Sequence, residues 1–150
     1  MKIIIETIPH NNQRYNTCGD WTWEDNFKTL HVKVSEMIDI VNVVSHTYME
    51  ATIGLHEVIE ALQCQADGVL SKTVDDFDLS QDTTDDCEKL DIEPGDHPDA
   101  PYKQQHTLAT GFERILCFCF GIPWYEYENQ LITMTFEYDE RKDRENSRPK

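Results

Sequence analysis

The 150-residue sequence lacks long hydrophobic runs and is poor in basic residues. No apolar stretch approaches the roughly 20 residues that a membrane-spanning helix needs, and the apolar part of residues 1–6 is too short for a signal peptide. The chain has 13 lysines and arginines but 29 aspartates and glutamates, which gives a formal net charge of −16. Nucleic acids and anionic lipid surfaces bind to clusters of basic side chains. The composition therefore argues against a nucleic-acid partner and against a membrane partner.

Several common functional signatures are also missing. The sequence contains no glycine-rich phosphate loop, no nucleophile elbow and no EF-hand calcium loop. Its five cysteines are odd in number and include no Cys-x-x-Cys pair. This usage is typical of reduced thiols, so we expect a cytoplasmic location.

The negative charge is concentrated in one part of the chain. Between Asp75 and Asp99 there are eleven acidic residues and one basic residue, so this segment supplies −10 of the net charge of −16. Residues 79–101 also contain three prolines and few large apolar side chains, which predicts a long acidic loop. We interpret the loop as a solubilising insertion, with a lid over a neighbouring site and a negatively charged interaction surface as alternatives.

The chain is long enough for one domain with its own core, and its patterning predicts an α+β fold. Apolar and polar residues alternate in its first third, as in half-buried strands, and later recur about every 3.6 positions, as in helices. Strands are expected at residues 2–8, 21–24 and 30–35, main helices at 39–64, 102–121 and 124–134, and a short helix at 73–80. We therefore predict one metal-binding domain over residues 1–138, with a small N-terminal antiparallel sheet packed with three main helices.

Two further expectations concern the second half of the chain. In the 102–121 helix the apolar stripe consists of Leu108, Phe112, Ile115, Leu116 and Cys119. An amphipathic helix turns such a stripe toward the core. Residues 139–150 contain five basic and four acidic residues and are hydrophilic, which predicts a flexible C-terminal tail.

The most informative motif is His56-Glu57-x-x-Glu60 within the first main helix. Residues four apart project from one helix face, so His56 and Glu60 are placed as two metal ligands. Glu57 lies about 100° further around the helix axis, where it could act as a catalytic base without binding the metal. The motif therefore predicts a metal site with an adjacent base.

A metal site needs at least a third protein ligand. His106 is the leading candidate, because it begins the next strong helix. Glu113, two turns later on the same face, could add a ligand or orient one, and Asp78 is the other nearby carboxylate. Two histidines with carboxylates suit a divalent metal, zinc first, with manganese or iron as alternatives.

The motif resembles the active helix of zincin-like metallopeptidases, with Glu60 in place of the second histidine. That resemblance implies metal-dependent hydrolysis of an amide or similar bond, and a strand at residues 30–35 that edges the cleft. Residues 1–130 are also similar to small uncharacterised proteins of bacteriophages and their bacterial hosts, which implies the host cytoplasm as location if a phage encodes the chain. The residues that carry this second resemblance are, in order, His56 to Glu60, Phe77-Asp78, Pro94-Gly95-Asp96 and His106.

The sequence thus predicts a metal-dependent hydrolase, but it leaves other interpretations open. The chain could be a non-catalytic acidic interaction or inhibitor protein with a structural metal. The pairs Glu57-x-x-Glu60 and Asp75-x-x-Asp78 also resemble the magnesium site of MazG-like nucleotide pyrophosphohydrolases. The Trp21/Trp23 pair is interpreted as core and hairpin packing. The substrate, any protein partner and the oligomeric state are left open by the sequence.

Overall fold

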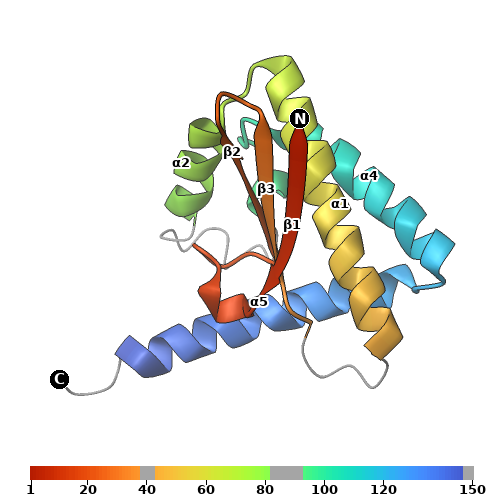
Figure 1. Ribbon diagram of the computed structural model, residues 1–150. Helices are drawn as coiled ribbons and strands as arrows, with labels where there is room; N and C mark the ends of the chain where they lie inside the picture. The colour runs from red at the N-terminus through yellow and green to blue at the C-terminus, as the bar shows by residue number, and fades with distance from the viewer. Residues whose placement is uncertain (38–42, 82–92, 147–150) are drawn as a thin grey trace.

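The computed structural model describes residues 1–37, 43–81 and 93–146 and shows, within them, a three-stranded sheet and four α-helices (Figure 1). The strands are β1 (Lys2–Ile8), β2 (Gly19–Glu24) and β3 (Thr29–Ser35). The helices are α1 (Val43–Asp67), α2 (Ser71–Gln81), α4 (Lys103–Phe120) and α5 (Trp124–Asn146), and two short 3-10 helices are η1 (His10–Asn12) and η2 (Pro94–Asp96). The predicted α+β fold with an N-terminal sheet is confirmed.

The sheet has the strand order β1-β3-β2. Strands β2 and β3 form the predicted antiparallel hairpin, and residues 25–27 of its turn all have positive φ. Strand β1, however, pairs with β3 in parallel, so the prediction of a purely antiparallel sheet is wrong for this pair. Alternation of side chains specifies which face of a strand is buried but not which strand is its neighbour. Here β1 and β2 are not neighbours in the sheet, because the second strand of the hairpin, β3, lies between them.

Strand β3 is therefore the central strand of the sheet. Its residues Leu30, Val32 and Val34 are at most 1% exposed, because α1 covers the same face of the sheet. In Figure 1, α1 and α4 lie behind the sheet and α5 crosses below it. This packing puts α1 between the sheet on one side and α4 on the other.

Helix α4 forms where it is predicted, but the face that it buries is opposite to the predicted one. Its buried residues are Gln105, His106, Ala109, Glu113 and Cys117. The predicted stripe is largely exposed: Leu108, Phe112, Ile115 and Cys119 all face solvent. The expectation that the stripe faces the core is wrong, because the polar residues His106 and Glu113 recur with the same helical spacing and find charged partners on α1.

Two predicted boundaries also change. Helix α5 continues to Asn146, so residues 139–146 are helical where the sequence predicts a tail. These residues are rich in glutamate, lysine and arginine, which favour a helix without needing a buried face. Of the predicted acidic loop, residues 79–81 belong to α2 and residues 94–96 form η2, which packs against α4. Residues 82–92 lie outside the described part of the chain.

Candidate metal centre

Helix α1 brings the motif residues to the middle of the fold. His56, Glu57 and Glu60 are all buried, on the side of α1 that faces β2 and α4. Buried ionisable side chains are rare unless they are paired or bind a metal. The partners of these three residues therefore decide what the site can do.

Glu60 lies between two histidines. Its Oε2 atom is 2.9 Å from Nδ1 of His106 and 3.5 Å from Nε2 of His56. One potential ligand atom from each of these three side chains lies within 4.8 Å of the others, a spacing that can hold a metal ion. His106, separated from the motif by 46 residues, is thus brought to it by the antiparallel packing of α4 on α1.

Each histidine also presents its second ring nitrogen to another carboxylate. Nδ1 of His56 lies 3.1 Å from Oε2 of Glu113, an ion-pair distance without hydrogen-bond geometry. Nε2 of His106 lies 3.4 Å from Oε2 of Glu93. Histidines that bind metals usually direct their other ring nitrogen to a carboxylate or carbonyl, which orients the ring. Both candidate ligands have this arrangement.

A second set of contacts holds the carboxylates. The indole Nε1 of Trp21 in β2 donates a hydrogen bond of 2.8 Å to Oε1 of Glu60, which leaves Oε2 to face the histidines. The hydroxyl of Tyr127 in α5 donates to Oε1 of Glu113. The site is thus supported by β2 and α5 as well as by α1 and α4.

The loop before α4 positions His106. Gly95 in η2 is buried against the imidazole ring, and a Cβ atom at this position would overlap the ring atoms of His106. The ring also makes an edge contact with the ring of His56, with 4.9 Å between centroids. The Pro-Gly-Asp sequence therefore has a packing role: it lets the backbone approach the histidine closely.

The electrostatics of the cluster are those of a buried ion-pair network. Burial lowers the pKa of His106, but its hydrogen bonds to Glu60 and Glu93 outweigh this and raise the pKa to about 10. Burial likewise lowers the pKa of His56, and the charge of Glu113 outweighs it, so that pKa is raised well above its usual value. Burial raises the pKa of Glu60, yet hydrogen bonds from both histidines hold it at about 2. A metal cation would take the place of the two ring protons.

Glu57 lies beside this cluster and not within the three-residue group. Its carboxylate packs directly on Gly19 of β2, where a Cβ atom would overlap the carboxylate. Burial raises the pKa of Glu57 well above its usual value, and the charge of Glu60 adds to this effect. Glu57 is thus a buried carboxyl group that holds a proton more strongly than an exposed glutamate does.

The other two predicted ligands have different places. Glu113 contacts His56 but is not one of the three grouped residues, and this position fits the orienting role predicted as its alternative. Asp78 is not brought into the group of possible ligands: it accepts hydrogen bonds from the hydroxyls of Tyr15 and Tyr102. Burial is the main cause that raises the pKa of Asp78 to about 7, against the hydrogen bonds from the tyrosines.

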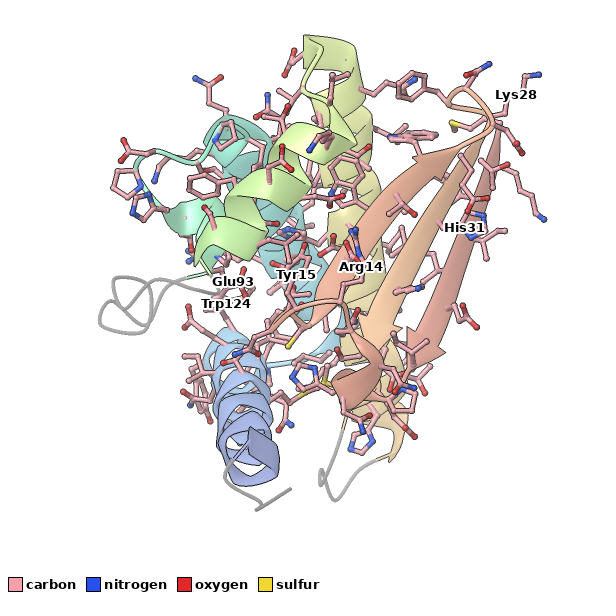
Figure 2. All side chains as sticks on the ribbon, turned by 90° about the vertical axis from the view of Figure 1, so that its left-hand side faces the viewer. Arg14, Tyr15, Lys28, His31, Glu93 and Trp124 are labelled. Carbon is pink, nitrogen blue, oxygen red and sulfur yellow. The ribbon has the colours of Figure 1, made fainter. Side chains whose placement is uncertain are left out.

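Asp75, another acid of the alternative magnesium site, is likewise engaged elsewhere. Arg14 forms paired contacts with both Asp20 and Asp75, which tie α2 to the segment before β2. Figure 2 shows Arg14 and Tyr15 on the helix side of the sheet, whereas His31 lies on the opposite side of the sheet.

Sequence reasoning missed Trp21, Tyr127 and Glu93 as supporting residues of the site. Trp21 is buried, as its packing interpretation requires, but its hydrogen bond to Glu60 joins residues 39 positions apart. No spacing in the sequence carries information about such a contact. The Pro94-Gly95-Asp96 motif was the one available signal, because it precedes His106 closely.

The comparisons with known proteins add no relative. No protein-family model matches this chain, and neither a curated protein nor a solved structure matches it. The resemblances to zincins and to phage proteins therefore stay predictions. Across the described residues, the helices are too short or too polar to cross a membrane.

Proposed function

We propose that this protein is a metal-dependent hydrolase that binds a divalent metal, zinc first, through His56, Glu60 and His106. One observation carries the metal site: each histidine directs one ring nitrogen to the Glu60 carboxylate and the other to a separate carboxylate, Glu113 or Glu93. A neutral imidazole donates a hydrogen bond through one ring nitrogen only, so a carboxylate at each nitrogen fits either a protonated ring or a ring whose second nitrogen is bound to a metal. Two histidines with this double arrangement around one oxygen support a coordination site.

The donor set favours zinc among the common metals. Two imidazole nitrogens and one carboxylate oxygen are suited to zinc, and also to manganese or iron. Three protein ligands leave one position of a tetrahedral site for water or substrate, as in catalytic zinc sites. Zinc bound there would polarise a substrate oxygen and activate water for attack.

Glu57 is the residue that would move the proton. In the proposed role its carboxylate takes a proton from the attacking water and passes it to the leaving group. A general base works best when its pKa lies near the working pH. Burial raises the pKa of Glu57 from the value of an exposed glutamate, which is the direction that this role requires.

A structural metal is the second candidate, and burial favours it. The side chains of His56, Glu60 and His106 are only 5–7% exposed. A metal at this point would join α1 to α4 and, through Trp21, to β2. Such a metal would stabilise the fold without catalysis.

The deciding experiment measures metal content and then turnover. Protein purified without chelator is analysed by elemental mass spectrometry, and chelator-treated protein is titrated with Zn²⁺, Mn²⁺ and Fe²⁺. We expect about one metal per chain, lost in His56→Ala and retained in the control His31→Ala, whose ring lies outside the site. Absence of binding for all three metals would refute the site.

Turnover is then tested on 4-nitrophenyl acetate and on fluorescently labelled casein, with the metal-loaded protein. Glu57→Gln is expected to keep the metal and lose hydrolysis of whichever probe is cleaved. Hydrolysis retained in Glu57→Gln would remove this residue from the mechanism. Full metal occupancy with a raised melting temperature and no turnover on either probe would favour the structural candidate.

A further inference from the structure

The candidate metal centre is closed to solvent, so a metal or a substrate reaches it only when some part of the fold moves. The side chains of His56, Glu60 and His106 are 5–7% exposed. A buried metal site needs a path of entry. Segments that open locally are those with few buried apolar contacts. The element that gives access is therefore to be sought among the less firmly packed neighbours of the site.

Helix α2 forms an outer layer next to this centre. The ring of Tyr102, the residue before α4, makes an edge contact with the ring of His106, with 6.3 Å between centroids. Tyr102 also contacts α2 twice, because its ring lies edge-on to the ring of Phe77 and its hydroxyl donates to Asp78. In Figure 2, α2 lies in front of α1 and α4. From α2 inward, the contacts thus lead through Tyr102 to the candidate ligand His106.

Helix α2 contributes little to the apolar core. Within the described side chains of α2, Val74 is the only buried apolar residue, whereas Phe77 is partly buried and Leu79 is exposed. Most of the stability of a helix in a protein comes from packing of its apolar face. Helix α1, which buries several apolar side chains between the sheet and α4, has much more of this stabilisation.

Polar contacts hold α2 to the segment before β2. The guanidinium of Arg14, which is fixed on Asp20 of β2, also contacts both carboxylate oxygens of Asp75 in α2, at 2.9 and 3.1 Å. The hydroxyl of Tyr15 donates a hydrogen bond of 3.0 Å to Oδ2 of Asp78. We call these two contacts, Arg14–Asp75 and Tyr15–Asp78, the α2 clasp. Water can replace polar contacts of this kind at a small net cost when α2 moves away.

The chain enters α2 through a point that can bend. Gly68 follows the last residue of α1 with a φ of 77°, and no described atom lies within 4 Å of its Cβ position. Leu70, the last residue before α2, is 58% exposed. Hinges consist of a few residues at the ends of elements that absorb a change in backbone angles. Gly68 has the conformational freedom and the open surroundings that such a hinge requires.

We propose that α2 is a lid that opens about Gly68 to give metal and substrate access to the candidate metal centre, and that the α2 clasp keeps it closed. This inference rests on the metal site of the proposed function. An opened α2 uncovers Tyr102 and, through it, the side of the site at His106. A lid of this kind makes a buried site compatible with turnover, since opening admits the reactants and closing excludes water.

The test measures how fast zinc enters and leaves the full chain. Zinc-loaded protein is mixed with an excess of a chromophoric chelator to measure release, and metal-free protein is mixed with Zn²⁺ to measure uptake. A weaker clasp raises the open population without changing the ligands. Release and uptake rates should therefore rise by the same factor, and the zinc dissociation constant, which is their ratio, should stay unchanged. Damage to a ligand would instead raise the dissociation constant.

Two variants weaken the clasp, and one is a matched control. In Asp75→Asn, which loses a partly exposed ion pair, we expect both rates to rise about two- to fivefold. In Tyr15→Phe, which loses a hydrogen bond to a buried carboxyl group, we expect a rise of about tenfold. The control is Asp76→Asn, because Asp76 is the next residue of α2 but pairs with Lys72 of the same helix. Its rates should equal those of the wild type.

Hydrogen exchange of the metal-free protein is the second measurement. The amides of α2 should exchange faster than those of α1, and both clasp variants should accelerate exchange in α2 further. Absence of zinc binding would refute the metal site and the lid with it. Zinc binding with rates that neither clasp variant changes, faster release without faster uptake, or α2 amides as protected as those of α1 would overturn the lid and leave the metal site standing.

Discussion

Trp21→Phe is expected to weaken zinc binding at the candidate metal centre while the chain stays folded. The substitution keeps an aromatic ring in the core but removes the indole N–H that donates 2.8 Å to Oε1 of Glu60. That hydrogen bond directs the other oxygen, Oε2, toward His56 and His106. Without it the carboxylate is free to rotate, and one of its buried oxygens has lost its donor.

The size of the effect follows from the type of hydrogen bond. A hydrogen bond to a charged group contributes about 1.5–3 kcal/mol, which corresponds to a change in dissociation constant of roughly 10–150-fold. Loss of an orienting contact at a metal ligand typically costs about 10–100-fold in affinity. We therefore expect the zinc dissociation constant of Trp21→Phe to rise by one to two orders of magnitude.

Trp23→Phe is the matched control. Trp23 lies on the same strand, and its indole N–H has no hydrogen-bond partner among the residues that the structure describes. Both variants lose similar apolar area, so both should lose some stability, but Trp23→Phe should retain zinc affinity. The assay is competition titration of chelator-treated protein against a chromophoric zinc chelator. Equal zinc affinity in wild type and Trp21→Phe, or an equal loss in both variants, would refute the orienting role of Trp21.

Two further predictions concern residues around the site. Gly95→Ala is expected to displace the ring of His106, since a Cβ atom there overlaps the imidazole, and to reduce zinc affinity about tenfold or more in the same titration. The control Gly111→Ala, whose Cβ position is open, should bind zinc normally. Normal zinc binding by Gly95→Ala would contradict the packing role of Gly95. Asp78 has its pKa raised from 3.8 to about 7, with burial as the main cause, so its contribution to stability is complete below pH 3.8 and is lost as the pH rises through about 7. Asp78→Asn does not titrate, and its free energy of unfolding relative to wild type should therefore increase between pH 4 and pH 8, by up to roughly 4 kcal/mol. Urea unfolding of metal-free protein at several pH values measures this difference, and a difference that does not change with pH would show that Asp78 ionises normally.

The local parts of the fold and of the site could be read from the sequence. Side-chain alternation predicted the hairpin of β2 and β3, and helical spacing predicted α1, α4 and α5, because both patterns depend on neighbours within a few residues. The placement of His56 and Glu60 could be predicted for the same reason. Four residues of helix are enough to place their side chains on one face, whatever the rest of the chain does.

The sequence by itself thus determined the α+β class and a pair of potential ligands, together with His106 as a candidate third. Only the tertiary structure decided that His106 joins them, that Asp78 does not, and that Trp21 and Glu113 hold the cluster in place. It also decided that β1 runs parallel to β3 and that the apolar side of α4 faces outward. The physical reason is the same in each case. Local periodicity states which residues share a face, but the partner of that face is chosen by packing and by the pairing of buried charges between segments far apart in the chain.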